Sequence, residues 1–159
     1  MTTFLLRTLP LSLAAVLAGS AFLLSPALPT ARAADAVSQF QLAPSTAKVA
    51  VGKARLSVET LTRSGEGFVG GYKVEVSPIP VGNESGQLAV RVSDEELQKL
   101  AGGQEIRFKG TATNTKGDHS EVSGTATPAG KEGDSGAVHI RIKSKKGSVS
   151  FDTTYKLVR

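Results

Sequence analysis

Two histidines, His119 and His139, are the side chains of this sequence best suited to acid–base or metal chemistry near neutral pH. His119 follows Gly117 and Asp118 in a predicted turn, and His139 occupies the polar side of a predicted strand. Neither has the paired spacing of a metal site, and no Gly-x-Ser-x-Gly nucleophile motif accompanies them. The sequence therefore assigns no catalytic residue and no metal ligand, and it predicts no cofactor.

The carboxylates give no clearer indication of catalysis. They fall mostly on predicted polar faces or turns, where a glycosidase-like pair has the same appearance as ordinary solubilising acids. The chain has no cysteine, which excludes disulfides and thiolate sites, and it has no tryptophan, which disfavours a sugar-stacking cleft. A non-enzymatic protein is therefore the main functional hypothesis, and a hydrolase of unknown type is its second alternative.

A repeated Gly-Thr-Ala-Thr sequence points to space inside the domain. It occurs at 110–113 and at 124–127, on segments predicted to be hairpin partners. Strand alternation directs the small residues of both copies inward, namely Gly110, Ala112, Gly124 and Ala126. Two interpretations of this space are open. Either it binds a small apolar ligand, or the side chains of Phe68, Tyr72, Phe151 or the helix leucines fill it. The threonines of the repeat then face outward, as ordinary strand residues or as part of a partner-binding sheet face.

The first 33 residues have the organisation of a cleaved export signal. Arg7 supplies the positive region and 11–24 the apolar region, and Ala31 and Ala33 form a small-x-small cleavage motif before Ala34. Cleavage after Ala33 leaves 126 of the 159 residues. Prolines and serines interrupt the apolar stretch, so we expect membrane contact only if this segment stays uncleaved. The sequence predicts an exported protein, either periplasmic or secreted.

The charge of the mature chain is modest. The signal removes Arg7 and Arg32 and none of the 14 acidic residues, so the net charge falls from +5 to +3. Basic and acidic residues alternate along most of the chain, which predicts no nucleic-acid partner. One local cluster is interpreted as a solvated hairpin end, with an anion site as the alternative: Arg141, Lys143, Lys145 and Lys146.

Alternation of apolar and polar residues predicts an all-β domain over 48–159, preceded by a flexible N-terminal arm at 34–47. Seven or eight antiparallel strands of this size close as a sandwich or as a barrel, and the sequence does not choose between them. The expected strands are 54–62, 68–77, 87–92, 105–113, 121–127, 137–143 and 148–158, with a shorter one at 48–51.

One segment is predicted to be helical. Ser93 and Glu96 have the spacing of a capping box, and acidic residues occupy the first turn. Leu97 and Leu100 share one face, and two glycines follow the last turn. We therefore expect one short helix over 94–101.

A shift of 50 residues superposes much of the chain on itself. Pro78 falls on Pro128 and Arg91 on Arg141, which is consistent with two copies of a three-strand unit of about 50 residues. Recurrence of strand and turn residues is the alternative explanation. In either case the alignment predicts one core face, made of Leu88, Val90, Val92, Val138, Ile140 and Ile142.

The sequence thus leaves two non-enzymatic functions open. An exported β domain can act by binding or structural association, with an unknown protein or surface as its partner. Alternatively it can carry a small, lipid-like apolar ligand in a barrel cavity. The two differ in their interiors, because association requires a filled core and an exposed face or edge.

Overall fold

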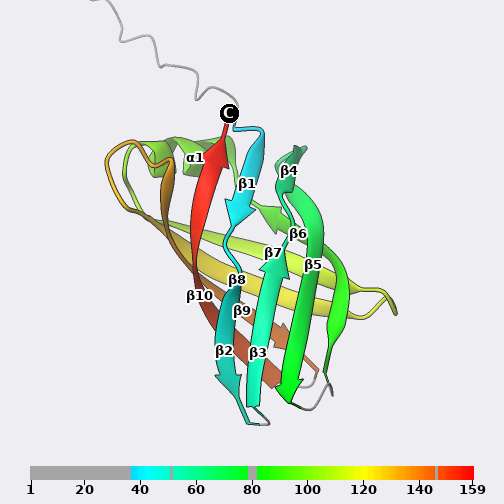
Figure 1. Cartoon of the computed structure of the whole chain (residues 1–159). Helices are drawn as coiled ribbons and strands as arrows, with labels where there is room; N and C mark the ends of the chain where they lie inside the picture. The colour runs from blue at the N-terminus through cyan, green and yellow to red at the C-terminus, as the bar shows by residue number, and fades with distance from the viewer. Residues whose placement is uncertain (1–36, 51, 79–81, 146) are drawn as a thin grey trace, which may run out of the picture. The chain divides into compact units, whose positions relative to one another are not determined.

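The computed structural model describes residues 37–50, 52–78, 82–145 and 147–159 (Figure 1). The predicted signal and its cleavage residues Ala31, Ala33 and Ala34 lie outside the described residues. The described chain forms ten strands and one helix: β1 (Gln39–Leu42), β2 (Ser45–Val49), β3 (Gly52–Val58), β4 (Leu61–Ser64), β5 (Gly67–Pro78), β6 (Glu84–Arg91), α1 (Asp94–Ala101), β7 (Ile106–Asn114), β8 (His119–Pro128), β9 (Ser135–Ser144) and β10 (Gly147–Val158).

Eight of these strands close into an antiparallel barrel. The sheet runs from β5 through β4, β1, β10, β9, β8, β7 and β6, and β6 pairs with β5 to complete the ring. Strands β2 and β3 extend the wall at one end, with β3 paired to β5 and β2 paired to β3. The prediction of an all-β fold with one short helix is confirmed, and the barrel is the alternative that the structure adopts.

The N-terminal segment belongs to the barrel wall. Residues 34–47 were predicted to be a flexible arm, but from Gln39 onward they form β1 and most of β2. β1 lies between β10 and β4 and joins the two ends of the sheet. The alternation was hidden because the inward phase changes near Pro44: Phe40 is buried before it and Ser45 after it. Each half of the pattern is too short to be recognised alone.

A similar interruption separates β3 from β4, which the sequence predicted as one strand. Val58 pairs with Tyr72 and Thr62 with Val69, so this side carries one more residue than β5. That count is a β-bulge, and it turns Leu61 inward, where it is 2% exposed. The bulge keeps both halves of the strand apolar toward the interior.

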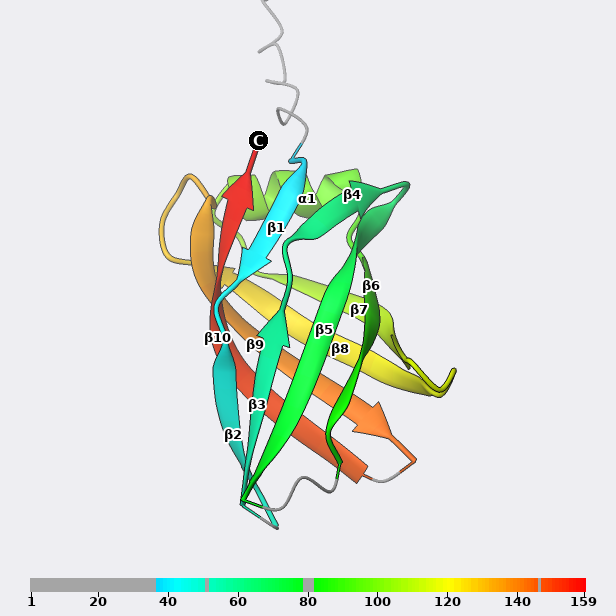
Figure 2. The ribbon, with the colours of Figure 1, turned by 45° about the vertical axis from the view of Figure 1, so that its right-hand side comes forward.

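The helix has the predicted bounds and the predicted cap. The Ser93 hydroxyl accepts a hydrogen bond from the amide of Glu96, and the Glu96 carboxylate accepts one from the amide of Ser93. Leu97 and Leu100 are buried, so the helix packs its apolar face onto the barrel. Figure 2 shows α1 lying across the end of the barrel where β1 begins and β10 ends.

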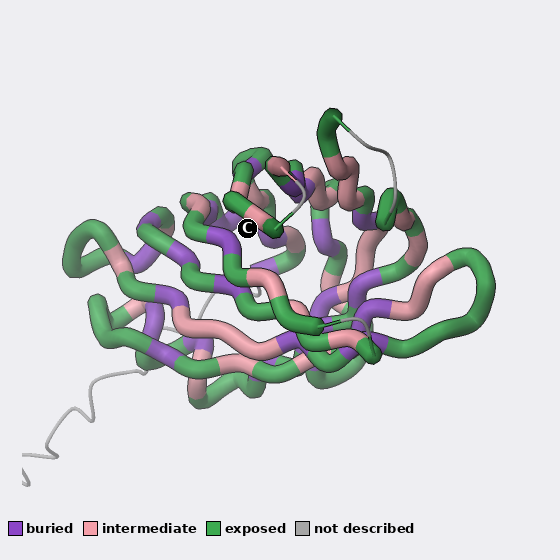
Figure 3. The backbone as a smooth tube through the Cα atoms, turned by 90° about the horizontal axis from the view of Figure 1, so that it is seen from below, coloured by how far each residue is buried: buried purple, intermediate pink, exposed green. Residues whose placement is uncertain are grey.

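The predicted core face is confirmed. Leu88 and Val90 on β6, Val92 directly after it, and Val138 and Ile140 on β9 are buried, and Ile142 is half-buried. The segments matched by the 50-residue shift are successive three-strand meanders, β3/β4 to β6 and β7 to β9, and β5 and β6 have the same inward phase as β8 and β9. Common ancestry of the two meanders stays a prediction. Figure 3 shows buried and exposed residues alternating along strands of the barrel.

Candidate functional site

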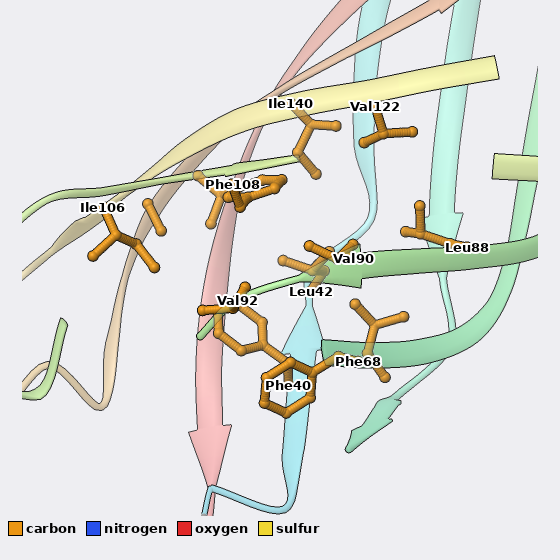
Figure 4. Close-up of a pocket in the computed structure, with 13 residues that line it drawn as sticks. Phe40, Leu42, Phe68, Leu88, Val90, Val92, Ile106, Phe108, Val122 and Ile140 are labelled. Carbon is orange, nitrogen blue, oxygen red and sulfur yellow. The ribbon is translucent and has the colours of Figure 1, made fainter. Parts of the chain in front are cut away.

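The barrel interior is apolar and nearly filled. Its central cavity measures about 30 Å³ and has no polar lining. Figure 4 shows aromatic and aliphatic side chains from several strands pointing toward it. A space of this size admits one or two waters at most, and its apolar walls offer them no hydrogen bond. It is much smaller than the pockets that hold lipid-sized ligands.

Aromatic side chains fill the space left by the small residues of the Gly-Thr-Ala-Thr repeat. Ala112 and Ala126 are buried, as predicted, while Gly110 and Gly124 are half-buried. The Phe108 ring packs over Gly124. Phe108 and Phe40 were not among the residues predicted to fill this space. Phe40 stacks on Tyr155 with ring centroids 5.0 Å apart and meets the edge of Phe68 at 5.8 Å.

A cleft opens at the end of the barrel opposite α1. Its volume is about 940 Å³, and its walls come from β2, β3, β5, β9 and β10. Most apolar side chains that line the cleft are only half-buried, unlike those in the middle of the barrel, although Ala54 and Phe151 are buried. Apolar groups line much of it: Ala47, Val49, Val74, Val76, Ile142 and Val149.

The cleft exists because β2 and β10 separate. Backbone pairing between the first strand and β10 ends with the bond from the Ala43 amide to the Thr154 carbonyl, 3.0 Å long. The Ser45 hydroxyl then donates to the Asp152 carbonyl at 2.5 Å, so a side chain replaces the next backbone bond. Beyond that point, within the described residues, β2 pairs only with β3 and β10 only with β9. Two sheet edges therefore border the cleft.

Polar and charged residues line part of the rim of the cleft. Tyr72 donates a hydrogen bond of 2.8 Å to Glu84, a rim residue. Burial, and then this bond and the nearby carboxylate, raise the pKa of Tyr72 above its usual value. Lys48 and Asp152 complete the charged part of the rim. Strand alternation turns both of these side chains outward, and the Asp152 carboxylate pairs with His139, so their charges stand outside the apolar centre.

The two histidines lie apart on the outer surface. His139 Nδ1 is 2.7 Å from the Asp152 carboxylate, and both side chains are well exposed, at 50% and 87%. His119 Nδ1 is 3.0 Å from the Thr113 hydroxyl at the tip of the β7–β8 hairpin. The pair of His139 with Asp152 was not predicted from the sequence. It follows from strand register, because the two residues are directly opposed on β9 and β10.

The threonine face is partly engaged in local bonds. The Thr127 hydroxyl donates to Glu105 at 2.8 Å, and Thr113 is bonded to His119. Thr111 and Thr127 are exposed, whereas Thr113 and Thr125 are half-buried. The four residues face outward, as predicted, but they form no separate apolar or charged surface.

The described part of the chain contains neither a metal-binding cluster nor a helix that could span a membrane. No group of three or more histidine, cysteine or acidic side chains there is placed to hold a metal ion. No helix among the described residues is long and apolar enough to cross a membrane.

Comparison with known families finds one similarity. Residues 84–153, which are 70 of the 159, match the model of the family described as cyanobacterial tandem bacteriocin. The matched segment runs from the start of β6 to the middle of β10 and includes α1. Comparisons with curated proteins and with solved structures found no significant match. Five consecutive strands and the helix of this chain are therefore similar to that family.

Proposed function

We propose that this chain is an exported, non-enzymatic protein that acts by binding another polypeptide, and that the cleft between β2 and β10 is its binding surface. The observation that carries the proposal is the difference in volume between the interior cavity and the cleft. The interior cavity measures about 30 Å³, whereas the cleft measures about 940 Å³. Association through the cleft is favoured over transport of a ligand inside the barrel.

The two open edges indicate the form of the partner. Unpaired strand edges present rows of backbone donors and acceptors, which an extended segment can satisfy by adding a strand. Alternate residues of a strand direct their backbone groups to the same neighbour. Because the carbonyls of Asp152 and Thr154 point toward the first strand, the backbone of Ser150 and Ser148 faces the cleft. The apolar lining then receives every second side chain of the partner segment.

The similarity to a bacteriocin family supports export and a non-enzymatic role. A bacteriocin is a protein that a bacterium releases against other bacteria, which agrees with the export signal predicted at 1–33. Mass spectrometry of the protein isolated from its source tests export directly. We expect a chain that begins at Ala34, and a full-length cytoplasmic chain would contradict the proposal.

Photocrosslinking tests the cleft. A photoreactive residue in place of Val149, inside the cleft, is expected to crosslink to a polypeptide partner, whereas one in place of Val69, on the outer side of β5, is the matched control. The crosslinked peptide is then synthesised and bound to the protein. Strand addition predicts that backbone amides of 46–49 and 148–152 become protected from hydrogen exchange.

Two outcomes count against this function. Crosslinking that is equal at positions 149 and 69 would place the partner elsewhere. A peptide that binds without protecting β2 or β10 would exclude strand addition. Native mass spectrometry of the isolated protein distinguishes polypeptide binding from the ligand-carrier alternative. A bound lipid mass would favour the carrier and would require the interior cavity to expand.

A further inference from the structure

A shallow groove runs along the outside of β8 between two rows of basic side chains. Its floor consists of Ser123, Gly124 and Thr125, all half-buried, and its volume is about 580 Å³. Arg91, Arg107 and Lys109 line one side, and His139 and Arg141 line the other. A second hollow of about 460 Å³ shares Ser123 and Arg141 and continues the groove to Lys143 and Lys145. We call the two together the β8 groove.

Strand register fixes the spacing of the charges. Ser123 lies between Lys109 on β7 and Arg141 on β9, and Thr125 lies between Arg107 and His139. Neighbouring strands are about 4.8 Å apart, so the two basic rows are separated by roughly 10 Å at the backbone. Small residues between long cationic ones leave a trough of about the width of one tetrahedral anion with its hydrogen-bond partners.

Five basic residues of the groove have no acidic partner among the described residues, whereas His139 is paired with Asp152. Among the described residues, no ion pair involves any of Arg91, Arg107, Lys109, Arg141 and Lys143. Arg91 and Lys109 stand directly opposite each other across β6 and β7, an arrangement of like charges that destabilises a sheet. A bound polyanion would offset this repulsion.

Two carboxylates border the β8 groove. Glu96 accepts hydrogen bonds from the amide and hydroxyl of Ser93, so it serves the helix cap. Glu121 stands opposite Lys143 near the hairpin end. Between them, the row that crosses the sheet through Arg91, Lys109 and Arg141 contains no acid. The groove therefore remains strongly positive in its middle.

We propose that the β8 groove binds a linear phosphate polymer, one extended chain with a negative group at each repeat. A single-stranded nucleic acid fits less well, because it needs aromatic side chains on which bases stack. The one aromatic residue of the groove, Phe108, also lines the barrel interior. A bilayer fits less well because, among the described residues, no large apolar side chain stands exposed beside the basic rows to enter it. The proposal develops the anion site that the sequence leaves open as the alternative for the cluster around Arg141, Lys143 and Lys145.

Paired charge variants test the proposal. The probe is fluorescently labelled inorganic polyphosphate, and anisotropy measures its dissociation constant for the protein as isolated. Lys109→Gln with Arg141→Gln removes one cation from each row, and Lys131→Gln with Lys156→Gln removes the same charge from exposed sites elsewhere. All four residues are exposed, so both proteins should fold alike.

We expect the groove variant to weaken binding roughly tenfold at constant salt and to reduce the dependence of affinity on salt, since fewer counterions are released. The control variant should bind within about twofold of the unmodified protein. Equal weakening by both variants would show attraction by net charge alone and would overturn the proposal. Tighter binding to single-stranded DNA, or to phosphatidylglycerol vesicles, than to polyphosphate would overturn it as well. The groove and the cleft adjoin at Ser144, Gly147 and Ser148, but Lys109 and Arg141 do not line the cleft, so these results test the groove separately.

Discussion

The ring of Phe108 lies over Gly124, its partner across β7 and β8. A methyl group at position 124 would lie 2.5 Å from Cζ of that ring and 2.2 Å from the carbonyl oxygen of His139. The absence of a side chain at Gly124 is therefore what allows an aromatic ring to fill the barrel at this level. The pair explains why the small-residue repeat leads to a filled interior.

Replacing Gly124 with alanine should destabilise the fold. The new methyl group meets backbone that cannot move without disturbing the β8–β9 ladder, so we expect a loss of about 1–3 kcal/mol in the free energy of unfolding. Urea denaturation measures it. Gly130→Ala is the control, because nothing lies within 4 Å of a methyl group there and its φ is not in the left-handed region. A Gly124→Ala variant as stable as the parent would show that Phe108 does not need this gap.

Phe151 carries much of the packing of β10. Its side chain is 1% exposed, and Tyr155 and Leu157 on the same face are also buried, as the alternation predicted. Phe151→Ala should cost about 3–5 kcal/mol in the free energy of unfolding, through lost burial and the cavity left behind. Ser150→Ala, at the exposed neighbouring position, should change it by less than about 0.5 kcal/mol. A loss below about 1 kcal/mol for Phe151→Ala would contradict the assigned face.

The cap of α1 gives a smaller and separate effect. Ser93→Ala removes the acceptor for the Glu96 amide and one half of the capping box, which should cost about 1 kcal/mol. Ser93→Asp keeps a side-chain acceptor at the same position and should stay close to the parent. Thermal melting followed by circular dichroism compares the three proteins. An unchanged midpoint for Ser93→Ala would mean that burial of Leu97 and Leu100 alone holds the helix.

Alkaline pH should weaken the fold through Tyr155. Burial, and secondarily the charge of Asp134, raise the pKa of Tyr155 from 10.0 to about 12, and its hydroxyl donates to the Gly133 carbonyl at 2.9 Å. Above pH 10 the unfolded chain loses this proton while the folded chain keeps it. The contribution is therefore complete below pH 10 and is lost as the pH rises toward 12.

Urea unfolding at about pH 9 and about pH 11 measures this loss. Tyr155→Phe should be less stable than the parent at the lower pH, because it lacks the bond to Gly133, and should lose less stability between the two pH values. Some pH dependence should remain in the variant, since the pKa of Tyr72 is raised as well. Identical slopes for parent and variant would remove Tyr155 as a source of the effect.

The amino-acid sequence by itself determined the local structure of most of this chain. Strand alternation gave the all-β class and the inward face of β6 and β9, and the spacing of Ser93 and Glu96 gave the helix with its bounds. These features depend on neighbours a few residues apart, so they are visible in one sequence.

Only the tertiary structure decided how the barrel closes and where it stays open. β1 joins the ring by pairing with β10, more than 100 residues away in the chain, and its phase change near Pro44 hid it from the alternation pattern. The separation of β2 from β10 creates the cleft, and strand register aligns Lys109 and Arg141 on either side of Ser123. Such relationships depend on which strands become neighbours, and alternation along a single strand contains no information about its partner.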